Sequence, residues 1–215
     1  MLPKLCNWRE HPVFATSAST KGEAKPAKTA EAGGKVKLGK LPEWNLADLY
    51  QGPESPKLKT DLETSERAAD AMQERYAGKL AALLDGGKGG AHLAQAVREF
   101  EALNDVLGRV VSYASLLYAA DTSDPKRQKF FGDIQEKITA ISSKLLFFPL
   151  ELNRLDDAML ETTMAKSELG HYRPWIEYLR KDRPYQLEDR VEQLFHEKSQ
   201  SGYAAWNRLF DQTIS

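Results

Sequence analysis

The sequence predicts an all-α fold, in which a long antiparallel three-helix bundle is followed by several shorter helices. Two observations predict it. Between residues 55 and 150, apolar residues recur at steps of three or four, the spacing that gathers them on one face of a helix. No segment combines sustained apolar–polar alternation with β-branched residues, so we expect essentially no sheet.

Composition divides the chain into a basic lead and an acidic remainder. The chain has 215 residues, 41% of them hydrophobic and 28% charged, which is ordinary for a globular protein. Residues 1–40 hold eight Lys or Arg against three Glu and almost nothing to bury, which predicts a disordered basic tail. The remainder carries a net charge of −6, which argues against binding to nucleic-acid phosphates. No apolar run approaches the roughly 18 residues of a membrane span, so we expect no membrane partner.

The only cysteine, Cys6, lies in the basic lead and has no second cysteine with which to form a disulfide. The first residues lack the apolar core of a signal peptide, because charged and proline residues interrupt them. Both observations favour a cytoplasmic protein.

Order is expected to begin near Leu41, where Trp44 and the following leucines supply the first apolar group before a Gly52-Pro53 turn. Ser55 and Pro56 are a typical N-cap and first residue of a helix. That helix should continue to the glycine-rich run at 85–90, because four glycines in five positions are costly inside a helix. Its expected apolar face is Leu58, Leu62, Ser65, Ala69, Met72, Tyr76 and Leu80.

Two more long helices should complete the bundle. The second is expected over 91–120, and the third begins at Asp124-Pro125 by the same capping logic and is interrupted at Pro149. Short connections between long amphipathic helices give antiparallel neighbours. The expected apolar faces are Leu93, Val97, Phe100, Leu103, Leu107, Val110, Ala114 and Leu117, then Phe131, Ile134, Ile138, Ile141, Leu145 and Phe148.

Shorter helices are expected after Pro149, because glycine and proline residues punctuate the sequence more often there. We therefore divide the chain into a tail (1–40), a long-helix bundle (41–150) and a group of shorter helices (151–215). The shorter helices are expected over 156–166, 171–182, 187–199 and 202–213.

The histidines offer only a weak candidate for a zinc site. His196-Glu197 begins like a zinc-protease helix, in which a second histidine one turn later completes the ligand pair. Gln200 occupies that position, so we interpret His196 as a histidine on the helix surface. The other histidines, His11, His92 and His171, fall on separate segments and suggest no metal site.

Two further motifs have structural interpretations. The run from Asp85 to Gly90 follows a helix and lacks the Ser or Thr of a phosphate-binding loop, so we interpret it as a linker. A basic cluster, interleaved with aromatic residues, could contact an anion or a peptide carboxylate. We favour a structural interpretation of the cluster, in which its side chains lie along a helix at a domain interface with their charged ends in solvent. The basic residues of this cluster are Arg173, Arg180, Lys181 and Arg183.

Four segments, in the same order along the chain, resemble the region that precedes the catalytic domain in oligoendopeptidase F-type metallopeptidases. These are zinc metallopeptidases similar to thimet oligopeptidase. One departure is Tyr185, where relatives usually carry a histidine that is not a zinc ligand. The four segments are Trp44-Asn-Leu-Ala-Asp-Leu-Tyr50, Ser112–Pro125, Tyr172–Leu179 and Glu197–Asp211.

The resemblance implies an all-helical zinc enzyme that hydrolyses short peptides in a channel between two helical halves. The family's zinc ligands and catalytic glutamate match no position here, so no catalytic, metal or cofactor-binding residue is expected in this chain. We expect zinc in a following catalytic domain, with this chain forming one wall of the channel. The apolar face of the last helix favours a truncated chain. The alternative is a standalone helical interaction module without catalysis. Peptide preference and oligomeric state are left open.

Overall fold

The computed structural model describes residues 44–84 and 89–214, which form helices and no strand. The all-α prediction is confirmed. The predicted tail, Cys6 and residues 85–88 of the glycine-rich run lie outside the described residues. The helices are α1 (Pro56–Tyr76), α2 (Leu80–Leu83), α3 (Gly89–Ala120), α4 (Pro125–Leu145), α5 (Phe147–Arg154), α6 (Asp157–Lys166), η1 (Glu168–Tyr172), α7 (Arg173–Arg180), η2 (Arg183–Tyr185), α8 (Asp189–Lys198) and α9 (Tyr203–Ile214), where η marks a 3-10 helix.

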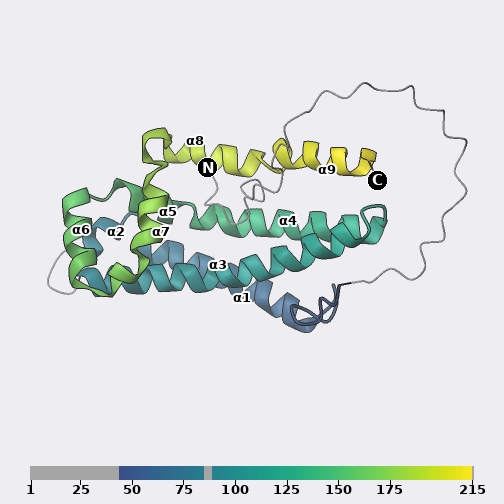
Figure 1. Ribbon diagram of the computed structural model, residues 1–215, viewed down its shortest axis with the longest axis horizontal. Helices are drawn as coiled ribbons and strands as arrows, with labels where there is room; N and C mark the ends of the chain where they lie inside the picture. Colours follow the sequence, from purple (N-terminus) through teal and green to yellow (C-terminus); the bar gives the residue numbers. More distant parts are fainter. Residues whose placement is uncertain (1–43, 85–88, 215) are drawn as a thin grey trace, which may run out of the picture.

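The long helices α1, α3 and α4 pack against one another and alternate in direction (Figure 1). Their contacts are made by the apolar faces that the spacing predicted. On α1 all of the predicted face is buried up to Tyr76, and on α3 the face is buried from Leu93 to Ala114. On α4, Ile134, Ile141 and Leu145 are buried. Periodic burial of this kind identifies the core of an amphipathic bundle.

The first helix ends earlier than expected, at Tyr76 rather than at the glycine-rich run. Gly78 has a φ of 75°, a left-handed conformation that residues with a side chain rarely adopt. The chain turns there and then forms the short helix α2. The carboxylate of Glu151, on α5, accepts hydrogen bonds from the backbone N–H of Gly78 at 2.5 Å and of Leu80 at 3.4 Å. A residue 73 positions away therefore stabilises this corner.

The second helix begins earlier than expected, at Gly89 rather than residue 91. Both positions favour glycine, because neighbouring groups leave too little room for a Cβ atom. A Cβ on Gly89 would collide with the backbone of Leu84, and one on Gly90 would lie 2.6 Å from the Cβ of Ser167. These glycines permit close packing of the α3 N-terminus, in addition to any role in the linker.

The turn between α3 and α4 is closed by short-range polar contacts. Asp124 accepts a hydrogen bond from Lys126 N at 2.8 Å, which confirms its predicted role as N-cap. Gln128 Nε2 donates to the carbonyl of Thr122 at 2.7 Å. Ser55 and Pro56 are the N-cap and first residue of α1, as predicted, although the Ser55 side chain makes no capping hydrogen bond.

The region around Tyr50 packs onto the bundle as expected, with one exception. Tyr50 is buried, lies edge-on to the ring of Tyr113 at 5.3 Å, and donates a hydrogen bond to Asp61 at 2.8 Å. Burial and the Asp61 carboxylate both raise the pKa of its hydroxyl. Trp44 was expected to join this group, but its side chain is 77% exposed.

Helices α5, α6 and α7 cover one end of the bundle (Figure 1). Pro149 is accommodated in the first turn of α5, where its missing N–H has no helical acceptor. Phe148 is fully buried and stacks on Phe100 at 4.6 Å between ring centroids. The proposed division at residue 150 falls inside α5, and residues on both sides share one buried cluster. The division stays a prediction.

Candidate functional site

The last two helices, α8 and α9, run along the outer face of α4 on the side away from α1 (Figure 1). We refer to them as the arm. Apart from Phe131, which packs against the edge of the apolar core, the residues on the α4 face beneath the arm are polar or small. The α4 residues on this face are Gln128, Phe131, Gly132, Glu136, Thr139, Ala140 and Ser143.

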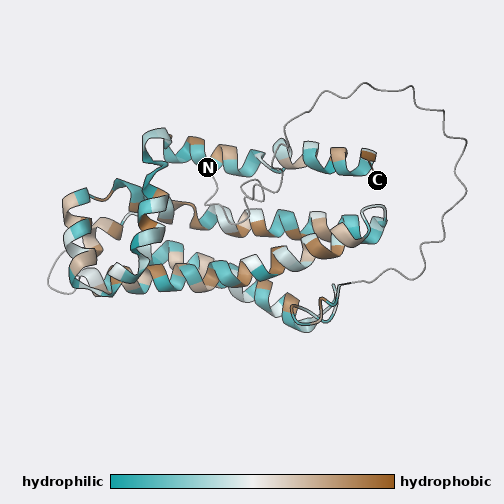
Figure 2. Cartoon of the chain, viewed as in Figure 1, coloured by the Kyte–Doolittle hydropathy of each residue, from teal (hydrophilic) through white to brown (hydrophobic). Residues whose placement is uncertain are grey.

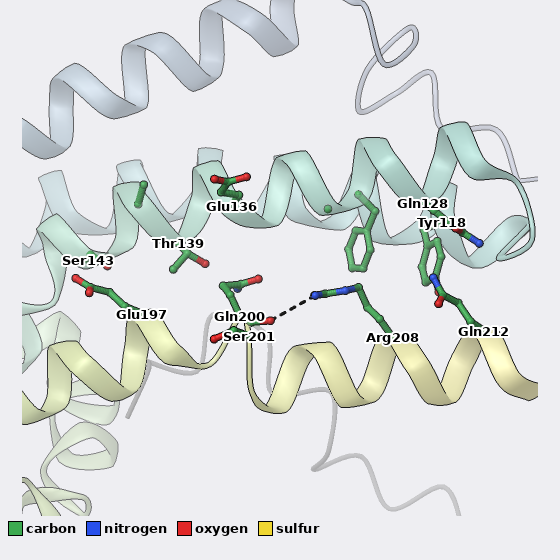
Figure 3. Close-up of a pocket in the computed structure, with 13 residues that line it drawn as sticks. Tyr118, Gln128, Glu136, Thr139, Ser143, Glu197, Gln200, Ser201, Arg208 and Gln212 are labelled. Carbon is green, nitrogen blue, oxygen red and sulfur yellow. Dashed lines mark hydrogen bonds between the residues drawn. The ribbon is translucent and has the colours of Figure 1, made fainter.

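Between α4 and the arm lies an open groove of about 750 Å³ (Figure 3). One end of the groove has an aromatic floor, where Tyr118 and Phe131 stack at 4.9 Å with an interplanar angle of 7°. The arm supplies mainly polar side chains to the opposite wall. These arm residues are Glu197, Gln200, Ser201, Arg208 and Gln212.

Arg208 is the cation that lines this groove, and two contacts fix its position. Its guanidinium donates to Gln135 Oε1 at 2.9 Å and to the carbonyl of Gln200 at 3.4 Å, the latter drawn in Figure 3. Two carboxylates, Glu136 and Glu197, also line the groove. The surface can therefore present both charge signs and several amide groups to a polar ligand.

Two titratable side chains of α8 are buried, and one of them contacts α4. The buried residues of α8 are Glu192 and His196, each only 3% exposed. Glu192 accepts a hydrogen bond from Leu187 N at 2.8 Å, and His196 Nε2 lies 3.3 Å from the carbonyl of Thr139 on α4. Burial lowers the pKa of the His196 imidazole below its usual value. The interpretation of His196 as a surface residue is wrong, because α4 covers it.

The opposite face of the arm carries large apolar side chains that point to solvent. We call them the apolar stripe: Leu194, Phe195, Trp206, Leu209, Phe210 and Ile214, which are 51–71% exposed. Helix α9 has no buried residue, and its side toward α4 carries Ala204, Ala205 and Arg208. The usual arrangement of an amphipathic helix is therefore reversed in α9, and Figure 2 shows hydrophobic segments along it.

The histidines of the described residues do not assemble into a metal site. His92 lies on α3, His171 on η1 and His196 on α8. Within 44–84 and 89–214, no group of three or more His, Cys, Asp or Glu side chains could hold a metal ion. These residues therefore do not fit a zinc site. No helix in the same part of the chain is long and apolar enough to cross a bilayer.

The three arginines of the predicted basic cluster pair with carboxylates at the junction of α5, α6 and α7, and Lys181 lies over the ring of Tyr178 at 5.9 Å. Arg180, with 13% of its side chain exposed, donates to the carbonyls of Leu152 and Leu155 and also pairs with Asp157. Asp157 pairs with Arg183 at 3.0 Å as well. Arg173 pairs with Glu161 at 2.7 Å, which supports the interpretation of this cluster as an interface.

Comparison with known proteins identifies the part of the chain that includes the arm. Residues 151–215 match the family model of oligopeptidase F. The resemblance inferred from the sequence is confirmed for this segment, which is an oligoendopeptidase F-like N-terminal region. The match begins within α5 and includes every later helix, so the arm and the apolar stripe lie in the oligopeptidase F segment.

For residues 44–150 the resemblance to oligopeptidase F stays a prediction. No curated protein and no solved structure matches the chain. The α4 side of the groove therefore lies outside the matched segment, while the arm lies inside it.

Proposed function

We propose that this chain is the N-terminal portion of a zinc-dependent oligoendopeptidase that hydrolyses short peptides in the cytoplasm. The family match over residues 151–215 carries this proposal. In the proposed enzyme, zinc and the catalytic residues belong to a following domain, because the described residues here offer no ligand set for the metal. The acidic remainder of the chain gives no reason to propose a nucleic-acid partner.

We further propose that this chain forms one wall of the peptide channel. Two features support that role. The ion pairs of Arg173, Arg180 and Arg183 fix the short helices to one another, which suits a rigid wall. The apolar stripe of the arm offers a large surface to a second helical body, and Trp and Phe side chains are typical of such contacts.

A peptidase assay tests the proposal directly. The 215-residue chain should not cleave a quenched fluorescent peptide, with or without added zinc, because the described residues offer no metal-held or activated water. The product of the complete reading frame that contains residues 151–215 should cleave the peptide, and a chelator should abolish that cleavage. Zinc-dependent cleavage by the 215-residue chain alone would overturn the division of roles.

The alternative function is a standalone helical interaction module, and the apolar stripe is also the observation that favours it. The same assay separates the two. If the product of the complete reading frame shows no chelator-sensitive hydrolysis, the peptidase proposal fails and the interaction module is favoured.

A further inference from the structure

The arm is attached to the rest of the molecule almost entirely by polar contacts. None of its residues belongs to the hydrophobic core, which ends with Ile176 and its neighbours. Besides the contact of His196 with Thr139, Arg154 pairs with Asp189 at the start of α8, and Arg208 bonds to Gln135 on α4. Polar contacts near the surface contribute little net free energy, so the arm is weakly held.

His196 is the centre of this attachment. In the neutral ring, Nε2–H donates to the carbonyl of Thr139, and Nδ1 is then a buried acceptor. Nδ1 has no hydrogen-bond partner among the described residues. A second proton would create an N–H at Nδ1 where no described group accepts it. A buried charged donor without an acceptor is strongly unfavourable.

Three carboxylates lie in this region, and one of them, Glu197, opposes that effect in part. Glu192 and Glu197 lie on α8, one turn before and directly after His196, and Glu136 lines the groove from α4. The loss of hydration on burial has the largest effect and lowers the pKa of His196 below its usual value, although the Thr139 carbonyl and the Glu197 carboxylate both favour the charged ring. The docked arm therefore holds the neutral ring.

We infer that His196 acts as a pH-sensitive latch, and that its protonation releases α8 and α9 from α4 while the helices from α1 to α7 stay folded. Release would expose Thr139 and the aromatic floor formed by Tyr118 and Phe131. The core would persist because no residue of the arm contributes to it.

The direction of the pH dependence follows from proton binding. A detached arm leaves His196 in water, where histidine has a pKa of about 6.5. The docked ring has a lower pKa, so the detached state binds more protons. Docking is therefore fully favourable above about pH 6.5 and weakens as the pH falls from there to the pKa of the docked ring.

Amide hydrogen exchange on the 215-residue chain tests the latch. Between pH 7.5 and 5.5, protection in α8 and α9 should fall by up to about tenfold in total, after correction for intrinsic rates. Protection in α3 should not change. His196→Gln, which keeps a donor for Thr139 but does not titrate, should remove the dependence. His171→Gln is the matched control, because His171 is exposed, and it should behave like the original chain.

A titration of the His196 ring by NMR completes the test and does not depend on any variant folding correctly. The His196 ring should titrate below about 6.5, the usual pKa of a histidine in water. A His196 pKa at or above about 6.5, a loss of protection in α3 equal to that in the arm, or the same pH dependence in His196→Gln would each overturn the latch.

Discussion

At the scale of single residues, Glu151 shows how one side chain can stabilise the boundary between two helices. Its carboxylate accepts hydrogen bonds from the backbone N–H groups of Gly78 and Leu80, at the corner between α1 and α2. The first N–H groups of a helix have no partner within the helix, so an acceptor from elsewhere stabilises its start. The corner therefore depends on α5 as much as on Gly78.

Replacing Glu151 by Ala should lower the free energy of unfolding by about 1–2 kcal/mol, because two backbone donors lose their acceptor. Chemical denaturation measures this loss. Glu63→Ala is the matched control, since Glu63 is exposed on α1, and it should change stability by less than about 0.5 kcal/mol. Equal effects of both substitutions would contradict the capping role.

The residues that the sequence could predict are those whose burial follows from periodicity. Leu58, Val97 and Ile141 lie on predicted faces and are buried. Glu151 and His196 could not be predicted, because a polar side chain is buried or bonded only when a distant segment packs against it. Glu151 acts across 73 positions, and His196 meets Thr139 across 57.

At the scale of elements, α4 has two faces with different roles. One face carries Ile134, Ile141 and Leu145 into the core, and the other presents Glu136 and Ser143 to the groove beneath the arm. The apolar face was predicted from its spacing. The groove was not, because its polar and small residues have the same composition as a solvated surface.

Substitutions on the two faces of α4 should differ strongly in effect. Ile141→Ala removes a side chain that is 4% exposed and should cost about 3 kcal/mol of stability through the lost contacts and the cavity left behind. Ile138→Asp, at a partly buried position on the same side, should also destabilise by several kcal/mol, since it introduces an unpaired charge. Glu136→Ala should change stability little. Thermal melts that showed equal losses for Ile141→Ala and Glu136→Ala would contradict the assigned faces.

At the scale of the whole molecule, the apolar stripe is the feature that a self-contained protein would be expected to bury. The sequence predicted an apolar face on the last helix, and the structure places its side chains Trp206, Leu209 and Phe210 in solvent together with Leu194 and Phe195 of α8. Large apolar side chains exposed on one face favour association with another protein surface. The stripe is proposed to contact a second helical body, and the same side chains should therefore govern how the isolated chain associates in solution.

The 215-residue chain should bind an apolar dye and self-associate as its concentration rises. Trp206→Lys combined with Phe210→Lys should reduce both, because these side chains are 71% and 62% exposed and support no internal packing. Tyr185→Lys is the control, at a side chain that is 75% exposed but lies outside the stripe. Sedimentation velocity measures the association. A chain that remains monomeric at every concentration and binds no dye would contradict this account of the stripe.

The closed turn between α3 and α4 has a kinetic consequence. The contacts that hold this turn join residues only six to ten positions apart, Thr122 to Gln128 and Leu117 to Arg127. Closing so short a loop costs little chain entropy, so the hairpin of α3 and α4 can form first and serve as a folding nucleus. The corner at Gly78 can form only after α5 brings Glu151 to it, and α8 can dock only after α4 has formed. The sequence of assembly would therefore place the arm last, and unfolding would begin where folding ended.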